Sequence, residues 1–328
     1  MTRSISFFYL LILFTGLIGC STAPTLGPFV ENYEFRFRQD HPYLEHSVPR
    51  GAGLTIHARE FGHSHSGNGP AIVLMHGFPD SLHLYDLVIP PLAKDHQVIA
   101  FDFLGWGYSD KPADHRYDVA SLRQDLEAVI RHFDLKSVVL VVHDLSGQPG
   151  IDWALDNKDR IESLVLLNTY YSPMASLKAP EAIARFSTPG LWRDVSVWFA
   201  SRGDSGWQGG VKEQIDKFFV NPKARETFTK IFMHQALKIR PAFFGENEVL
   251  PQEIAVREKE LPRLKEFRKP VRIIFGKDDP YLNTAVAKEF QNLFPQSELF
   301  LVNNAAHYVQ LDQPQQVASL IFSKTVHH

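Results

Sequence analysis

Short apolar runs alternate along the chain with longer segments in which apolar residues recur at helical spacing. A strand that is buried on both faces reads as an uninterrupted apolar run, and Val138-Val139-Leu140-Val141-Val142 is such a run. The pattern predicts strands at Leu54–Phe61, Ala71–His76, Gln97–Phe103, Ser137–Val142, Ser163–Leu167, Val271–Phe275 and Leu299–Val302. Strands that alternate with helices are typical of an α/β fold with a mostly parallel, doubly wound sheet.

Two segments carry the clearest helical spacing. Leu122, Leu126 and Val129 recur at intervals of three and four residues, and Val317 and Ile321 repeat that spacing near the C-terminus. Such a stripe is the face with which a helix covers a sheet. We therefore expect these two helices to pack on the sheet.

The alternation stops between residues 170 and 270, where no strand-like run occurs. Phe and Trp are frequent there: Phe186, Trp192, Trp198, Phe199, Trp207, Phe218, Phe219, Phe228, Phe232, Phe243 and Phe244. We interpret residues 170–270 as a helical cap inserted after the strand Ser163–Leu167 of a core formed by residues 46–169 and 271–328. Most of these aromatic side chains would pack the cap, and some would line an apolar pocket above the sheet edge.

The first 45 residues look different from the rest of the chain. Arg3 precedes an apolar run from Ile5 to Ile18, which is too short to span a bilayer comfortably. Leu17-Ile18-Gly19-Cys20 resembles the lipobox of bacterial lipoproteins, in which the cysteine is lipidated. That resemblance implies a signal peptide over residues 1–20, lipidation of Cys20, a tether over residues 21–45 and a lipid-anchored protein of the bacterial cell envelope.

Composition and charge limit the ligands and the covalent links that the chain can have. The 328 residues are 44% hydrophobic and 22% charged, and the net charge is −3, so nothing indicates binding to nucleic acid. Cys20 is the only cysteine, which excludes a disulfide within the chain. No motif indicates a metal or a cofactor, and the oligomeric state is left open.

The strand Ser137–Val142 leads into His143-Asp144-Leu145-Ser146-Gly147. Small residues at 146 and 147 allow a sharp turn from strand to helix, which lifts one side chain above the sheet. Aligning Ser146 and Gly147 with the small positions of that turn places Asp144 at the nucleophile position. The rival alignment, with Ser146 as nucleophile, needs small residues at 144 and 148, where the chain has Asp144 and Gln148.

The partners of a nucleophile follow in the order acid, then histidine. Asp279 lies just after the strand Val271–Phe275 and is the preferred orienting acid, with Asp278 as the fallback. His307 follows the last strand and is the expected base. After the strand Ala71–His76, the N–H of Phe78 would form an oxyanion hole together with the N–H of Leu145.

Several motifs resemble those of haloalkane dehalogenases and epoxide hydrolases, which are α/β-hydrolases with an aspartate nucleophile. They are the run from Phe101 to Pro112, the strand end Val141-Val142-His143-Asp144, the His76-Gly77-Phe78-Pro79 turn and the run from Ala306 to Gln310. The resemblance covers roughly residues 47–170 and 270–322. It implies attack by Asp144 on a carbon that bears a leaving group, followed by hydrolysis of the ester by water that His307 activates.

The residues that would stabilise the leaving atom differ from those found in each of these families. Leu145 stands where haloalkane dehalogenases have Trp, and it does not fit the arginine pattern of fluoroacetate dehalogenases. Epoxide hydrolases protonate the epoxide oxygen with tyrosines of the cap. Tyr170 and Tyr171, at the start of the cap, are the nearby candidates for that role. Trp192, Trp198 and His234 are further candidates for a donor from the cap.

The leading hypothesis is a cofactor-independent hydrolase of a small apolar substrate, an epoxide or a haloalkane, with a slight preference for the epoxide. Two alternatives stay open. One is a ligand-binding lipoprotein that has kept the fold without efficient turnover, and the other is a carboxylesterase that uses Ser146 or a water activated by His307.

Overall fold

A computed structural model describes residues 26–322 of the chain. Its centre is an eight-stranded sheet with the order β1-β2-β4-β3-β5-β6-β7-β8. β1 and β2 pair antiparallel to their neighbours, and all other pairs are parallel. The strands are β1 Leu44–Gly51, β2 Leu54–Phe61, β3 Ala71–Met75, β4 Val98–Phe101, β5 Val138–Asp144, β6 Ile161–Thr169, β7 Val271–Gly276 and β8 Ser297–Val302.

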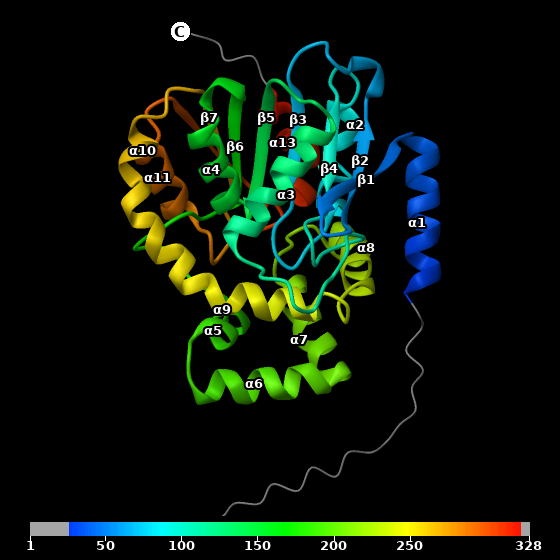
Figure 1. Cartoon of the computed structure of the whole chain (residues 1–328), viewed down its shortest axis with the longest axis vertical. Helices are drawn as coiled ribbons and strands as arrows, with labels where there is room; N and C mark the ends of the chain where they lie inside the picture. The colour runs from blue at the N-terminus through cyan, green and yellow to red at the C-terminus, as the bar shows by residue number, and fades with distance from the viewer. Residues whose placement is uncertain (1–25, 323–328) are drawn as a thin grey trace, which may run out of the picture.

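Helices cover both faces of this sheet (Figure 1). The predicted helix at Leu122 is α3, Val119–His132, and it lies with α4, Gly147–Asp156, in front of the sheet in the view of Figure 1. The predicted C-terminal helix is α13, Pro314–Ile321, which lies behind the sheet and packs against α2, Ile89–Leu92. α11, Thr284–Leu293, packs on β7 and β8, and α12, Val309–Asp312, follows the loop after β8.

The hydrophobic core lies where the central strands are covered on both faces. Every residue of β3, β4 and β7 is buried, and so are the first six residues of β5. Burial of apolar surface is the main force that holds such a sheet between two helical layers. The predicted α/β fold class, with its mostly parallel sheet, is therefore confirmed.

The segment that follows β6 is helical, as the sequence predicted. Its α-helices are α5 Glu181–Ser187, α6 Leu191–Arg202, α7 Asp204–Asp216, α8 Pro222–His234, α9 Arg240–Val256 and α10 Leu261–Lys265. In Figure 1 α9 runs along the lower edge of the core, and α5, α6 and α7 lie below it. The parallel strands end at this edge, so the cap helices cover the carboxyl ends of the strands.

The prediction of a tether over residues 21–45 is wrong from Gly27 onward. Gly27–Asp40 forms the helix α1, which buries Val30 and Phe37. The Tyr33 hydroxyl donates a hydrogen bond to Asp86, which joins α1 to the core. The strand β1 that follows is an edge strand with a single buried residue, Val48, and its mixed pattern gave no strand signal.

The predicted signal peptide and Cys20 lie outside the described residues. Within residues 26–322, none of the helices has both the length and the apolar character needed to cross a bilayer.

Candidate active site

Asp144 ends the central strand β5 in a strained backbone conformation. Its φ is +49°, a left-handed value that non-glycine residues seldom adopt, and α4 starts three residues later. Close packing requires a glycine at position 147, where α4 begins, because a Cβ there would lie 1.9 Å from Oγ1 of Thr169. The turn holds the Asp144 side chain at the carboxyl end of the sheet, where it lines a pocket beneath the cap.

The Asp144 carboxylate is held by backbone N–H groups. Oδ2 accepts a hydrogen bond of 3.1 Å from the N–H of Phe78, and the N–H of Leu145 donates to the same carboxylate. These are the two donors that the sequence assigned to an oxyanion hole. Gly77 permits this approach, since a Cβ there would lie 2.6 Å from Cβ of Asp144.

His307 faces the other oxygen of that carboxylate. Its Nε2 lies 3.9 Å from Oδ1 of Asp144, which is too long for a hydrogen bond. Its Nδ1 lies 2.9 Å from Oδ2 of Asp279. The three residues that the sequence selected therefore lie together in the order Asp144, His307, Asp279, while the fallback Asp278 is exposed.

Asp279 is fixed by donors that sequence reasoning missed. The amide of Asn168, at the end of β6, donates to Oδ2 of Asp279 at 2.9 Å. The N–H groups of Tyr281 and Leu282 donate to Oδ1 at 2.8 and 3.1 Å. Asp279 is buried, yet these donors and His307 hold its pKa below the usual value, so it stays an anion.

The charges around His307 favour its protonated form. Burial alone would lower the pKa of the imidazole, but the charge and hydrogen bond of Asp279, together with the charge of Asp144, raise it to about 9. Burial raises the pKa of Asp144, although His307 and the two N–H donors counteract part of that rise. The imidazolium form of His307 is thus favoured when no substrate is bound.

Ser146 does not occupy the nucleophile position. Its hydroxyl donates to the backbone oxygens of Met75 and His143, at 2.9 and 2.8 Å, and accepts from the N–H of His143. The residue is fully buried and is not part of the pocket wall. The Ser146 hydroxyl, which the rival alignment makes the nucleophile, therefore stabilises the turn through its hydrogen bonds to the backbone.

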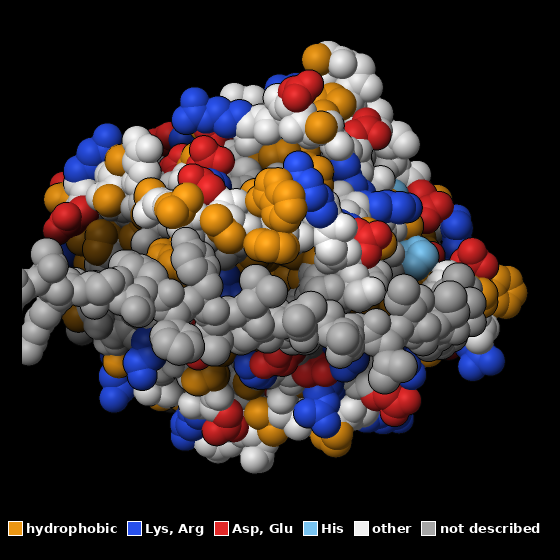
Figure 2. All heavy atoms as spheres, turned by 90° about the horizontal axis from the view of Figure 1, so that it is seen from below, with side chains coloured by type: hydrophobic (Ala, Val, Ile, Leu, Met, Phe, Trp, Pro, Cys, Tyr) orange, Lys and Arg blue, Asp and Glu red, His pale blue; other side chains and the backbone are white. Residues whose placement is uncertain are grey.

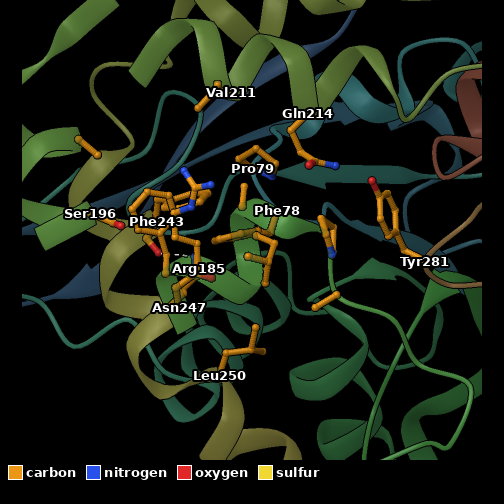
Figure 3. Close-up of a pocket in the computed structure, with 18 of the residues that line it drawn as sticks. Phe78, Pro79, Arg185, Ser196, Val211, Gln214, Phe243, Asn247, Leu250 and Tyr281 are labelled. Carbon is orange, nitrogen blue, oxygen red and sulfur yellow. Dashed lines mark hydrogen bonds between the residues drawn. The ribbon is translucent and has the colours of Figure 1, made fainter. Parts of the chain in front are cut away.

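A largely apolar pocket of about 660 Å³ lies between the core and the cap. Figure 3 shows Phe78 and Pro79 of the core with Gln214, Phe243 and Asn247 of the cap placed around them. Asp144 and His307 lie in its wall. A cavity of this size, with few polar groups, is typical of a site for an apolar small molecule.

The predicted leaving-group donors differ in where they lie. Tyr170 lines the pocket, and within residues 26–322 its hydroxyl has no hydrogen-bond partner. The hydroxyl of Tyr171 instead donates to Asp152 on α4, away from the pocket. Trp192 lies at the rim with 82% of its surface exposed, whereas Trp198 and His234 are not part of the wall.

Burial raises the pKa of the Tyr170 hydroxyl well above its usual value, and the charge of Asp144 adds to that rise. The hydroxyl therefore keeps its proton at every ordinary pH. Of the predicted donors, Tyr170 and Trp192 line the pocket, and Tyr170 is the buried one of the two.

Glu246 is a pocket residue that the sequence did not reveal. It lies on α9 and is almost fully buried, since only 4% of its surface is exposed. The indole N–H of Trp106 donates to its Oε1 at 3.0 Å, while Oε2 has no partner among the described residues. Burial holds its pKa well above the usual value, so Glu246 is a neutral acid. No spacing in the sequence links positions 106 and 246.

Asp80 is a second buried acid near the site. It accepts a hydrogen bond from the hydroxyl of Tyr308, the residue after His307. Burial raises the pKa of Asp80 to about 7, although Tyr308 and His307 both act to lower it. Its charge is one of those that raise the pKa of His307.

Comparison with known proteins agrees with this fold. The sequence model of a family described as the alpha/beta hydrolase fold matches residues 70–314. A haloalkane dehalogenase of Mycolicibacterium paratuberculosis is 29% identical over 308 residues, which cover 88% of this chain and 95% of that protein. The bifunctional epoxide hydrolase 2 of Sus scrofa is 22% identical and covers 82% of this chain and 53% of its own length.

A solved structure is similar as well. The haloalkane dehalogenase of Agrobacterium tumefaciens C58 superposes with a TM-score of 0.70 at 25% identity, covering 85% of this chain and 94% of that one. The sequence resemblance to the group of haloalkane dehalogenases and epoxide hydrolases is thereby confirmed.

Proposed function

The chain belongs to the α/β-hydrolase fold family, and from that premise we propose that it hydrolyses an apolar epoxide through an ester formed on Asp144. The observation that carries the proposal is the placement of the Asp144 carboxylate. One oxygen is held by the N–H of Phe78, and the other faces His307 across the floor of an apolar pocket.

In the first step, Oδ1 of Asp144 attacks a ring carbon of the epoxide and the carbon–oxygen bond breaks. A carboxylate needs no base for this attack, because it is already ionised. The hydroxyl of Tyr170 donates its proton to the oxygen that leaves the carbon, and the proton that His307 then releases returns through water to the phenolate. The position of Tyr170 in the pocket wall supports this role.

In the second step, His307 removes a proton from water, and the hydroxide adds to the carboxyl carbon of Asp144. The N–H groups of Phe78 and Leu145 stabilise the oxyanion that forms there. Collapse of the intermediate breaks the ester, and His307 returns the proton to the product oxygen. The product is a diol, and Asp144 is restored.

The charge of His307 changes in the direction that the second step requires. Asp144 is one of the anions that raise the pKa of His307 in the free protein. Esterification neutralises Asp144 and removes that contribution, so the pKa of His307 falls once the ester exists. The imidazole thus becomes a base after the first step, when a base is needed.

A carbon–halogen substrate has weaker support. Leu145 follows Asp144 directly and offers no indole N–H to a halide. Trp192, the cap candidate for that task, is 82% exposed at the rim of the pocket. The relatives include haloalkane dehalogenases, so a haloalkane panel belongs beside the epoxides in any assay.

The mechanism is tested by a single turnover in heavy-oxygen water with enzyme in excess over an epoxide. The proposal predicts that the label enters the Asp144 carboxyl group, while the first diol carries the original oxygen of Asp144. Mass spectrometry of the Asp144 peptide and of the product measures both. Label in the first diol together with an unlabelled Asp144 would exclude the ester route.

The role of Tyr170 is tested separately by Tyr170→Phe. Loss of the hydroxyl should slow ester formation from epoxides by about 10²–10⁴-fold, the usual range for proton transfer by a side chain. Tyr171→Phe is the matched control, because that hydroxyl bonds to Asp152 outside the pocket. Equal rates in both variants would remove Tyr170 from the mechanism.

We also propose that the chain is lipid-anchored at Cys20 in a bacterial envelope, on the strength of the lipobox-like sequence alone. Cys20→Ser should release the protein from the membrane fraction of expressing cells. Unchanged membrane association of that variant would contradict the proposal.

A further inference from the structure

The helix α6, Leu191–Arg202, buries none of its residues. Its large apolar side chains face solvent, with exposed fractions of 74% for Leu191, 82% for Trp192, 52% for Trp198 and 63% for Phe199. A cluster of this kind is unusual on the surface of a monomer and marks a surface that contacts something apolar. Figure 2, which views the molecule from the cap end, shows orange side chains gathered there with blue Lys and Arg side chains next to them.

This surface adjoins the pocket. Trp192 and Phe199 are largely exposed and also belong to the pocket wall, as do Val195 and Ser196 of the same helix. Trp192 and Phe199 therefore join the exposed surface of α6 to the wall of the cavity that also includes Asp144.

The charges near α6 favour an anionic partner. Arg202 lies 4.6 Å above the ring of Trp198, and Arg185 lies in the pocket wall. Among residues 26–322, neither arginine pairs with an acid, although Arg193 does pair with Glu248. Arg185 lies on α5 and Arg202 on α6, and the acid of α6, Asp194, lies 3.5 Å from Arg193. Trp and Phe beside such arginines are typical of a surface in the headgroup region of a membrane.

The start of the described chain lies toward the same end of the molecule. In Figure 1 the N-terminal end of α1 points downward, toward the side on which α6 lies. Six residues separate Cys20 from Gly27, the first residue of α1, and an extended chain of that length spans at most about 25 Å. A lipid on Cys20 would hold the start of α1, and with it the cap end, close to a bilayer.

We propose that α6 docks on an anionic phospholipid bilayer, so that the pocket opens into the membrane and takes its substrate from the lipid phase. Leu191, Trp192, Trp198 and Phe199 enter the acyl boundary, while Arg185 and Arg202 contact lipid phosphates. The docking concerns delivery of the substrate and does not depend on which bond the site cleaves.

Tryptophan fluorescence can test the contact directly in the full chain. The five tryptophans are Trp106, Trp153, Trp192, Trp198 and Trp207, and three of them are buried while the two on α6 are exposed. The full chain is bound to vesicles of phosphatidylethanolamine and phosphatidylglycerol with brominated acyl chains. Bromine quenches only an indole that reaches the acyl region, so quenching reports on α6.

The proposal predicts quenching of the wild type and its loss in a Trp192→Phe/Trp198→Phe double variant, which keeps the three buried indoles. Phe199→Glu should reduce the quenching of the two α6 tryptophans, and replacing phosphatidylglycerol by phosphatidylcholine should reduce it as well. Leu44→Glu is the matched control, since Leu44 is 45% exposed on the edge strand β1 and not on α6. This control should be quenched as the wild type is.

Unquenched fluorescence from vesicle-bound wild type, with sedimentation confirming that the protein is on the vesicle, would overturn the proposal. A second copy of the chain could cover α6 instead. In that case the protein would sediment as a dimer that Phe199→Glu dissociates, and the brominated lipids would leave the wild type unquenched. An effect of Leu44→Glu as large as that of Phe199→Glu would also count against a specific role of α6.

Discussion

The two oxygens of the Asp144 carboxylate have different surroundings, and this difference assigns them different tasks. Oδ2 accepts from the N–H of Phe78, whereas Oδ1 faces Nε2 of His307. An oxygen that already accepts from an oxyanion donor is suited to carry the negative charge of the second step. The oxygen toward His307 is suited to attack, and its ester would then lie where activated water arrives.

Sequence reasoning brought Asp144, Asp279 and His307 forward because each follows a predicted strand, and the carboxyl ends of parallel strands meet at one edge. It missed Glu246 and Asn168, because nothing near them in the sequence marks their partners. Glu246 bonds to Trp106 at a separation of 140 residues, and Asn168 bonds to Asp279 at a separation of 111. Such contacts depend on tertiary packing and leave no local pattern.

Ser146 provides a prediction that separates stability from chemistry. Ser146→Ala removes the hydroxyl that bonds to the backbones of Met75 and His143, leaving buried groups unsatisfied. The free energy of unfolding should fall by about 1–3 kcal/mol. The rate of ester formation on Asp144 should stay close to that of the wild type. Urea denaturation and single-turnover kinetics measure the two effects, and an inactive but fully stable variant would contradict the role assigned here.

Glu246 gives a prediction about pH. Its pKa in the folded protein is well above 4.5 because it is buried, so the folded state keeps a proton that the unfolded chain releases. The stability from this group is present below pH 4.5 and is lost as the pH rises through the folded-state pKa. Glu246→Gln retains a neutral acceptor for Trp106 and does not titrate.

The stability advantage of Glu246→Gln over the wild type should therefore grow with pH, by at most about 1.4 kcal/mol per pH unit. Urea denaturation of both proteins across a pH series measures the difference. A constant difference between the two proteins from acid to alkaline pH would show that Glu246 is ionised in the folded state.

Helices and strands with a clearly apolar face were predicted correctly, whereas those that mix polar and apolar residues were missed. The seven predicted strands correspond to β2 through β8, and the apolar runs of the central ones are buried on both faces. β1 has one buried residue, and α1 has two, so neither produces a strong periodic signal. Both elements lie at the margin of the core, where few residues need to be apolar.

The helix α1 offers a matched pair of substitutions. Phe37 is buried against Tyr43 and Phe61, whereas Phe35, two residues earlier, is 64% exposed. Phe37→Ala should lower the free energy of unfolding by about 3 kcal/mol, since it removes a buried ring and leaves a cavity. Phe35→Ala should change it by less than about 0.5 kcal/mol, as is usual for exposed positions. Equal effects in denaturation experiments would mean that α1 is not docked as described.

At the scale of the whole molecule, the sequence predicted a layered core and a helical roof, and both are present. It could not predict which cap residues face the pocket, because the cap helices carry aromatic residues on several sides. Phe243 is buried beside Phe78, while Trp192 and Phe199 line the pocket and are also largely exposed. The difference arises from how the helices pack on the core.

The sheet, the cap and the helix α6 have separate tasks in this molecule. The sheet fixes Asp144, His307 and Asp279, and the cap, to which α6 belongs, closes an apolar pocket over them. Of the buried acids, Asp80 contributes to the raised pKa of His307, and burial favours the neutral form of Glu246. Separation of delivery from chemistry means that changes on α6 should alter access to the pocket and leave the step at Asp144 intact.

The central claim is that a covalent ester forms on Asp144, and intact mass spectrometry of a His307→Ala variant tests it most directly. With the base removed, hydrolysis should slow by about 10²–10⁴-fold while attack by the carboxylate continues. After incubation with a panel of apolar epoxides and haloalkanes, we predict a protein heavier by one substrate residue, with the added mass on the peptide that contains Asp144. An adduct on Ser146, or no adduct on Asp144 from a substrate that the wild type turns over, would contradict the claim.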